Sequence, residues 1–172
     1  GFATALHDVL DDPEWLDLSD VTVVVLGAGA EMGPLRSLLR WGATVAAVDL
    51  PRPDLWTRVL DDTASSAGRL LVPASPGTSP LAERAGVDLI AGLPTATGWV
   101  CGLPGQLVVG NYVYADGATN VRVSTAVDAM TRIVRLARPD TALSFLATPT
   151  DVFAVPGEAV DASAQSYAQR RT

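Results

Sequence analysis

The stretch V-V-V-L-G-A-G-A-E-M-G-P-L, residues 23–35, decides the fold. Its first four residues are apolar, as at the end of a buried strand, and glycines follow at positions 27, 29 and 33. In a strand–turn–helix unit, the first glycine permits a tight turn. The next lets a pyrophosphate approach the backbone at the helix N-terminus, where amides and the positive end of the helix dipole lie. Gly27, Gly29 and Gly33 suit these roles, so the stretch predicts a turn that can hold a nucleotide.

Asp49 is the acidic partner of this turn. It ends the next apolar run, twenty residues after Gly29, where a carboxylate can hydrogen-bond the ribose diol of a dinucleotide and repel a 2′-phosphate. The spacing G-x-G-x-x-x-G departs by one residue from the usual dinucleotide fingerprint. We predict that NAD(P) is the cofactor and that its binding residues are Gly27, Ala28, Gly29, Met32, Gly33 and Asp49.

Glu31, in the middle of the turn, favours the opposite interpretation. A carboxylate beside a bound pyrophosphate costs several kcal/mol in a dry site. Near the start of a helix, however, the dipole favours a negative charge, and the side chain could point away. The alternative therefore stays open that the glycines serve only the close packing of a strand against a helix.

The composition is that of one folded domain without a basic surface. The chain has 172 residues, of which 48% are hydrophobic and 18% are charged, and its net charge is −7. All 12 bases are arginine, so no lysine is available for P-loop phosphate binding or Schiff-base chemistry. The acidic balance argues against a nucleic-acid partner, and no apolar run reaches the roughly 18 residues that cross a membrane. We expect a single cytoplasmic domain, residues 1–172, with a helical lead-in at 1–20.

The metal-binding side chains are too few for a metal centre. The chain has one cysteine, Cys101, and one histidine, His7, which stand 94 positions apart. A structural zinc site needs about four such ligands. We therefore predict no metal site, and we interpret Cys101 as a packing residue of an apolar segment.

Apolar runs bounded by glycine, proline and polar residues alternate with helical patterns, which is typical of strands and helices around a parallel sheet. Strands are expected at residues 21–26, 44–49, 69–72, 87–91, 106–110 and 141–147. Most of these runs are continuously apolar, as in strands that are covered on both faces. Helices are expected at residues 3–10, 34–41, 53–64, 80–85, 120–137 and 157–170.

Three further segments carry a family resemblance. The glycine turn contains G-A-G-A-E-M-G, and the chain continues with G-V-D-L-I-A-G and later with S-T-A-V-D-A-M-T-R-I-V-R-L-A followed by T-A-L-S-F-L-A-T-P-T-D. In that order, these segments resemble the first turn, the fourth strand, the last long helix and the sixth strand of the short-chain dehydrogenase/reductases. The resemblance spans residues 21–151. It implies a three-layer Rossmann-like α/β fold, a mostly parallel sheet of about six strands with helices on both faces. It also implies NAD(P)-linked chemistry on a small-molecule substrate and homodimers built on the long helix.

The family's catalytic Tyr-x-x-x-Lys pair is absent from this chain. In that family, the lysine binds ribose and lowers the tyrosine pKa so that the tyrosine can act as an acid or base. Here Asn120 and Ser124 stand at those two positions. The resemblance is therefore to a degenerate member of the family, and its ordinary carbonyl reduction does not carry over.

The stretch G-N-Y-V-Y-A-D-G, residues 110–117, is the chemically richest in the chain. It follows a predicted strand, and ligands of parallel sheets bind beyond the carboxyl ends of the strands. Tyr112 could donate a proton or stack on a ligand, and Asp116 could act as a base or orient that tyrosine, so these two are the catalytic candidates. Tyr112 and Tyr114 share a face if the strand continues. Alternatively, the tyrosines pack beside the sheet and Asp116 belongs to a turn before the helix.

Three functions remain open. The first is an NAD(P)-binding oxidoreductase-like enzyme, or a non-redox enzyme derived from one, acting on an unknown small molecule. The second is a cofactor-free Rossmann-like interaction or regulatory module, motivated by Glu31, the missing catalytic pair and the absence of lysine. The third is an S-adenosylmethionine-dependent methyltransferase, because G-A-G-A followed by W-G-A-T-V-A-A-V-D-L resembles the opening motif of those enzymes. They usually carry an acid where this chain has Val25.

Overall fold

The computed structural model describes residues 1–145 and 156–169. Its strands form one parallel sheet in the order β3-β2-β1-β4-β5. They are β1 (Val21–Leu26), β2 (Thr44–Val48), β3 (Arg69–Leu71), β4 (Gln106–Asn111) and β5 (Ala142–Phe145). The predicted α/β class with a parallel sheet is confirmed. The same order is found for the first five strands of the doubly wound dinucleotide-binding fold.

The helices occupy the intervals between the strands and both ends of the described chain. They are α1 (Phe2–Asp11), the 3-10 helix η1 (Pro13–Leu16), α2 (Leu35–Arg40), α3 (Pro53–Thr63), α4 (Leu81–Arg84), α5 (Leu93–Cys101), α6 (Gly117–Ala137) and α7 (Gly157–Gln169). The six predicted helices are present with small shifts at their ends, the largest of which is the start of α6, three residues before the predicted position. Residue 170, the predicted end of the last helix, lies outside the described residues. Helix α5 was not predicted.

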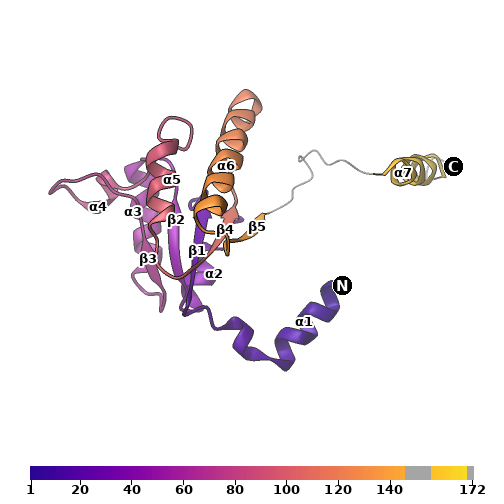
Figure 1. Cartoon of the computed structure of the whole chain (residues 1–172), viewed down its shortest axis with the longest axis horizontal. Coiled ribbons are helices and arrows are strands. Elements are labelled where there is room, and N and C mark those ends of the chain that lie inside the picture. Colours follow the sequence, from indigo (N-terminus) through magenta and orange to yellow (C-terminus); the bar gives the residue numbers. More distant parts are fainter. Residues whose placement is uncertain (146–155, 170–172) are drawn as a thin grey trace.

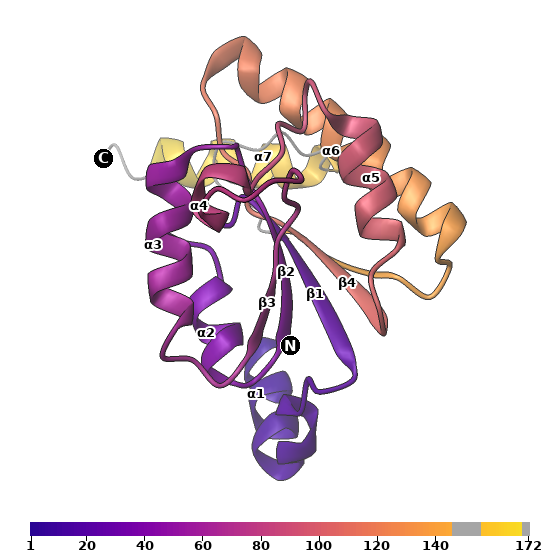
Figure 2. The same ribbon diagram turned by 90° about the vertical axis from the view of Figure 1, so that its left-hand side faces the viewer.

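Side chains of the central strands alternate between two hydrophobic clusters. Val24 and Leu26 of β1 belong to the first cluster, together with residues of α5 and α6. Val23 and Val25 belong to the second, together with residues of α2 and α3. The alternation arises because successive side chains of a strand point to opposite faces. Figure 2 shows α2 and α3 on one side of the strands and α5 and α6 on the other.

The prediction of a strand at residues 87–91 is wrong, and the described residues contain five strands and not six. The segment is a turn, because the Asp88 carboxylate accepts the amide of Ile90 at 2.7 Å and the Asp88 carbonyl accepts that of Gly92 at 2.7 Å. Its apolar side chains still pack against the first cluster, from the loop that leads into α5. Of the strand expected at 141–147, residues 146 and 147 lie outside the described residues.

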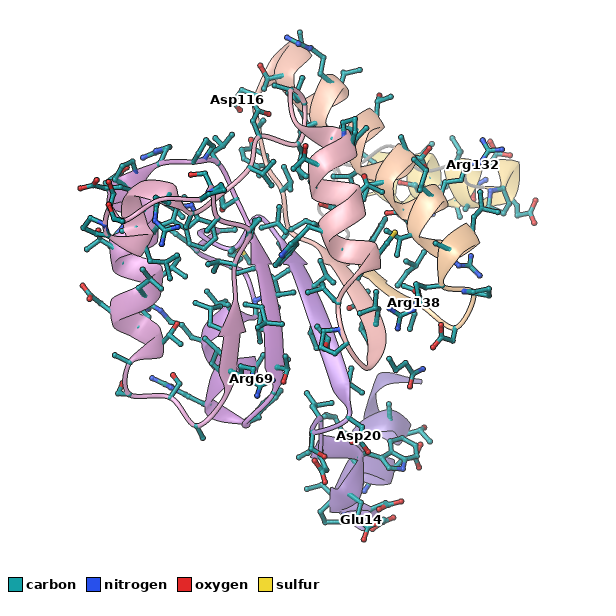
Figure 3. All side chains as sticks on the ribbon, turned by 60° about the vertical axis from the view of Figure 1, so that its left-hand side comes forward. Glu14, Asp20, Arg69, Asp116, Arg132 and Arg138 are labelled. Carbon is teal, nitrogen blue, oxygen red and sulfur yellow. The ribbon has the colours of Figure 1, made fainter. Side chains whose placement is uncertain are left out.

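Arg138, which follows α6 directly, ties the end of that helix to the loop before β4 (Figure 3). Its guanidinium donates to the carbonyl oxygen of Leu103 at 2.9 Å and to that of Gly105. On the other side of this loop, the Thr22 hydroxyl donates to the carbonyl of Pro104 at 2.8 Å. Arg138 after α6 and Thr22 of β1 thus hold the loop directly before β4 begins.

The two end helices lie away from the sheet (Figure 1). Helix α1 packs on η1, and α7 has no buried residue. Both are amphipathic in sequence and expose large apolar side chains, among them Leu10 and Val160. Within residues 1–145 and 156–169, no helix combines the length and apolar character needed to cross a membrane.

Candidate functional site

The glycine turn joins β1 to α2 and crosses the end of β4. Gly27 has a φ of +84°, a conformation that favours glycine, and its amide donates to the Val48 carbonyl at 2.9 Å. A Cβ on Gly27 would lie only 2.8 Å from the backbone oxygen of Tyr112. Gly27 is therefore required both by its conformation and by the close approach of the two strand ends.

Two consecutive turns separate Gly27 from the helix. The amide of Ala30 donates to the carbonyl of Gly27, and the amide of Gly33 donates to that of Ala30, each at 3.0 Å. Helix α2 begins only at Leu35 and has six residues. In the usual dinucleotide turn the helix begins beside the second glycine, whereas here it begins later. This later start corresponds to the longer spacing of the glycines in the sequence.

Asp49 contacts the turn directly. Its Oδ2 accepts the amide of Gly29 at 2.8 Å, and its Oδ1 accepts the amide of Leu50 at 2.7 Å. A Cβ on Gly29 would lie 3.3 Å from the same Oδ2 and 2.9 Å from Leu55. The structure therefore brings together two of the predicted cofactor-binding residues, Asp49 and Gly29, and only a glycine leaves their approach unhindered.

The other predicted residues of the turn differ in exposure. The side chain of Ala28 is buried in the second cluster, so its backbone is the part left to contact a ligand. Met32 is largely exposed and does not pack at the turn. Glu31 is exposed as well. The carboxylate that was expected to oppose a bound phosphate is thus solvent-accessible, although Glu31 also lines a cavity beside the turn.

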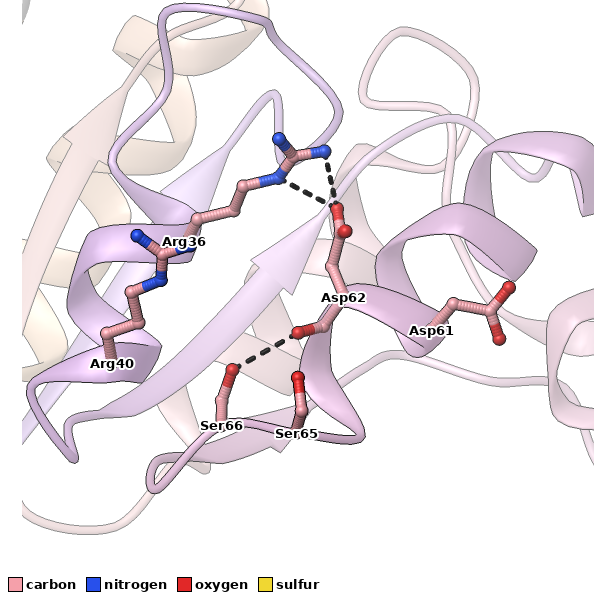
Figure 4. A pocket seen from close by; sticks show the side chains of 6 residues that line it. All are labelled: Arg36, Arg40, Asp61, Asp62, Ser65 and Ser66. Carbon is pink, nitrogen blue, oxygen red and sulfur yellow. Dashed lines mark hydrogen bonds and ion pairs between the residues drawn. The ribbon is translucent and has the colours of Figure 1, made fainter.

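A cavity of about 310 Å³ opens between the glycine turn and α3. It is lined by Ala28, Gly29, Ala30, Glu31, Gly33, Leu35, Arg36, Leu55, Arg58, Val59 and Asp62. A neighbouring cavity of about 210 Å³ lies between α2 and the end of α3 (Figure 4). Arg36 stands between them and binds Asp62, with its Nε at 2.9 Å and its Nη2 at 2.8 Å from Oδ2.

Sequence reasoning missed the two arginines that line the first cavity. Arg36 lies in the first turn of α2, and Arg58 lies on α3. A guanidinium is suited to phosphate and carboxylate oxygens. The available signal was the position of Arg36, three residues after the last glycine of the turn. Arg58 carried no comparable signal, because a helical arginine most often faces solvent.

The Tyr112 ring packs beside the sheet. Strand β4 ends at Asn111, and the Tyr112 amide donates to the Leu26 carbonyl at 2.8 Å. The ring lies against Gly110, where a Cβ would meet its edge at 2.5 Å. Tyr112 is partly buried against the second cluster. Packing beside the sheet was the alternative interpretation of this tyrosine.

Asp116 has a different tyrosine as its partner. The hydroxyl of Tyr114 donates to Asp116 Oδ1 at 3.2 Å, and both side chains are exposed. Asp116 is the N-cap residue of α6, in agreement with the expected turn before the helix. Since β4 stops at Asn111, the condition under which Tyr112 and Tyr114 would share a face is not met.

The predicted site residues nevertheless converge on one edge of the sheet. The glycine turn follows β1, Asp49 follows β2 and the segment 111–116 follows β4, and parallel strands end on the same edge. Figure 3 shows Asp116 at that edge and Arg69, which begins β3, at the opposite one. The chain leaves β1 and β4 toward opposite faces, so Gly27 and Tyr112 meet where ligands of such sheets bind.

Charged groups near Asp49 pair with one another. Arg52 binds Asp54 at 2.8 Å, and the hydrogen bond from Arg52 holds the pKa of the Asp54 carboxyl below its usual value. The same bond raises the pKa of Arg52.

The part of the chain that the structure describes contains no group of three histidine, cysteine, aspartate or glutamate side chains that could hold a metal ion.

Comparison with known proteins returned no relative of this chain: no family model, no curated protein and no solved structure matches it.

Proposed function

We propose that this chain is a Rossmann-like domain that binds an NAD-type dinucleotide, or a related adenosine diphosphate ligand, at the glycine turn and Asp49. The proposal depends chiefly on one observation, the 2.8 Å hydrogen bond from the Gly29 amide to Asp49 Oδ2. This bond holds the carboxylate that we propose to bind ribose against the turn that we propose to bind pyrophosphate, beside the point where β1 and β4 diverge.

The ribose would be held by Asp49. A carboxylate accepts about four hydrogen bonds, and the two amide contacts of Asp49 leave room for the hydroxyls of a diol. The same charge disfavours a 2′-phosphate. Arg52, the nearest cation along the chain, is already paired with Asp54. These contacts favour NAD over NADP.

The diphosphate would lie over the backbone of Gly29 and Ala30, with Arg36 and Arg58 on the α3 side of the turn. Glu31 lines the same cavity, but it is exposed, so water would screen the repulsion between its carboxylate and the phosphate. Arg36 would then exchange part of its contact with Asp62 for the phosphate. Such an exchange is inexpensive at an exposed ion pair.

Oxidoreductase chemistry is the less supported half of the proposal. A proton donor would have to come from Tyr112, whose ring packs on Gly110, or from the Tyr114–Asp116 pair at the start of α6. We also propose kinship with the short-chain dehydrogenase/reductases and a homodimer built on the long helix. Nucleotide binding is the function that the geometry supports best.

The test is a calorimetric titration with NAD⁺, NADH, NADP⁺, NADPH, ADP-ribose and S-adenosylmethionine. Binding of NAD⁺ or ADP-ribose should weaken about tenfold or more in Asp49→Ala, since a charged hydrogen-bond acceptor is lost. Asp54→Ala is the matched control, because Asp54 is an exposed acid five residues away that binds Arg52 and not the turn. Asp49→Asn keeps an acceptor for the Gly29 amide, and it should reduce the preference for NAD over NADP.

Equal affinity in Asp49→Ala and Asp54→Ala would refute the proposed ribose contact. Tight binding of S-adenosylmethionine alone would replace the proposal by the methyltransferase alternative. Failure of every ligand to bind would favour the cofactor-free module. One observation already favours that second candidate, namely that both oxygens of Asp49 accept backbone amides within the chain itself.

A further inference from the structure

The cavity beside the glycine turn runs away from the sheet edge at which the strands end. Its α3 side is formed by Leu55, Arg58, Val59 and Asp62, which are spaced as one stripe of a helix. Because β2 and β3 are parallel, α3 runs back from the carboxyl ends of the strands toward the opposite edge (Figure 2). From Leu55 to Asp62 this stripe covers about 10 Å of helix. A ligand that fills the cavity therefore extends along the groove between α2 and α3.

The predicted catalytic segment, residues 111–116, does not lie on this path. It follows β4, and Asp116 is the N-cap residue of α6. Helix α6 covers the opposite face of the sheet from α3 (Figure 2). Among the described residues that line the cavity, none belongs to this segment. A ligand held in the groove thus leads away from Tyr112 and Asp116.

The amides of the glycine turn already have acceptors within the chain. Those of Gly27 and Ala28 donate to the carbonyl of the last residue of β2, at 2.9 and 3.2 Å, and that of Ala30 donates to the Gly27 carbonyl. The Gly29 amide donates to Asp49. A pyrophosphate that crossed the turn toward β4 would need such amides as hydrogen-bond donors. Each of these four would first have to give up a bond within the chain.

Arginine side chains supply the positive charge of the groove. Arg58 lines the cavity from α3 and has no ion-pair partner among the described residues. Arg36 lines it from α2 and is bound to Asp62. Glu31, the other acid of the lining, is exposed to water. Since a guanidinium binds phosphate oxygens through parallel hydrogen bonds, Arg58 is the cation that is available to a phosphate in the groove.

Arg58 follows the predicted ribose contact along the groove. A Cβ on Gly29 would lie 2.9 Å from Leu55 and 3.3 Å from Asp49 Oδ2, so Leu55 marks the level at which a ribose on Asp49 would be held. Arg58 is about one turn of α3 farther from the strand ends, a rise of about 5 Å. The order of ribose and diphosphate in a nucleotide thus matches the order of Asp49 and Arg58 along the groove.

The second cavity, at the far end of the groove, is less suited to a phosphate. It lies where α2 ends at Arg40 and α3 ends at Thr63, and the carbonyl ends of helices carry partial negative charge. Arg40 stands in the last turn of α2, where it offsets the charge of that helix end. Figure 4 shows Asp62 directed toward Arg36 and Asp61 directed away from both arginines. A third phosphate would gain little there.

We infer that the ligand of this site ends at its diphosphate, as in ADP, with the ribose on Asp49 and the terminal phosphate between Arg58 and Arg36. The inference rests on the proposed nucleotide site and narrows its ligand class. A free terminal phosphate carries a second negative charge near neutral pH. In a dinucleotide that phosphate is esterified to a second ribose, which removes this charge and must occupy the same groove. The site then serves recognition of a nucleoside diphosphate and not hydride transfer.

Calorimetric titration of the full chain with ADP, AMP, ATP and NAD⁺ tests the ligand class. ADP should bind at least about tenfold more tightly than AMP, which lacks the phosphate that Arg58 would hold. It should exceed NAD⁺ by a similar factor, because the second ribose of NAD⁺ blocks that phosphate. ATP should bind no more tightly than ADP.

Two matched variants test the role of Arg58. Arg58→Gln should weaken the binding of ADP at least about tenfold, since a charged donor to the terminal phosphate is lost. Arg132→Gln removes an exposed arginine from α6, on the other face of the sheet, and should leave ADP binding unchanged. Both positions tolerate glutamine in a helix, and the melting temperature without ligand checks that both variants are folded.

An affinity for NAD⁺ that equals or exceeds that for ADP would overturn the inference and leave the proposed dinucleotide site in place. Equal ADP affinity in Arg58→Gln and Arg132→Gln would also overturn it, and loss of ADP binding in Asp49→Ala would then show that the nucleotide is still held at the turn. Tighter binding of ATP would refute the limit to two phosphates. Failure of all four nucleotides to bind would refute the proposed function itself.

Discussion

Substitution of Gly27 by alanine should be much more harmful than substitution of Gly42, although the two glycines have nearly the same conformation. Their φ angles are +84° and +80°, so both substitutions carry the penalty of about 1–2 kcal/mol for a side chain in the left-handed region. Both also gain the same small stabilisation from a stiffer unfolded chain. These two contributions cancel in the comparison.

The difference between the two sites is the space around the new methyl group. A Cβ at Gly42 meets nothing within 4 Å, whereas a Cβ at Gly27 lies 2.8 Å from Tyr112 O and 3.0 Å from Val113 N. This backbone cannot yield easily, because the Tyr112 amide is bound to Leu26 at 2.8 Å. Overpacking of this kind costs about 1–3 kcal/mol. Gly27→Ala should therefore lose about 2–5 kcal/mol, and Gly42→Ala about 1–2 kcal/mol.

The assay is equilibrium unfolding in urea, with the slope of the transition compared between the variants so that changes in midpoint report stability. A third variant, Tyr112→Phe, removes a hydroxyl but no backbone contact and should leave the difference unchanged. Equal losses at Gly27 and Gly42 would show that the turn and the end of β4 are not in close contact. The geometry on which the proposed site depends would then be incorrect.

Three further predictions concern stability and ionisation. Arg138→Ala should cost about 1.5–3 kcal/mol in chemical denaturation, because the carbonyls of Leu103 and Gly105 before β4 lose a charged donor, while Arg135→Ala on the exposed side of α6 should cost less than about 0.5 kcal/mol. Similar losses would contradict the role of Arg138. Thr131→Val should leave the melting temperature unchanged or raise it, since the buried hydroxyl of Thr131 has no hydrogen-bond partner among the described residues, and a loss above about 1 kcal/mol would reveal a missed partner. Because the folded-state pKa of Asp54 is depressed, the contribution of its bond with Arg52 is present at neutral pH and lost as pH falls through that lowered pKa. Arg52→Gln should raise the NMR-detected pKa of Asp54 toward its ordinary value, and an unchanged titration would refute the pairing.

The strand positions were predictable wherever a run was both apolar and part of the sheet. Residues 23–26 and 45–48 are buried between helices, so their sequences are continuously apolar, as is usual in parallel strands. The run at 87–91 is apolar except for Asp88 and is a turn, because the Asp88 carboxylate accepts the amide of Ile90 and the Asp88 carbonyl accepts that of Gly92. The bonds of one aspartate thus determine the structure of a run whose other four residues are apolar. A prediction from hydrophobic patterns does not detect a signal that depends on one residue.

The site was predictable in its backbone parts and less so in its side chains. The glycine turn and Asp49 were expected to meet, and they do, because both follow neighbouring parallel strands whose ends share one edge. The partner of Asp116 was not foreseen. Tyr112 bends back over Gly110, and this leaves Tyr114 beside the carboxylate. Which of two tyrosines faces an acid depends on where the strand stops, and strand ends are the least certain feature of a sequence pattern.

Local chemistry in the amino-acid order is sufficient for the α/β class, the glycine turn and most helices, because each depends on residues within one or two turns of the chain. The order of the strands depends instead on crossovers between distant segments. So do the contact of Arg36 and Arg58 with one cavity and the exposure of Ile133 and Leu136 on α6. These features depend on packing between residues that are far apart in the chain. The spacing of residues along the chain does not specify which distant residues come into contact.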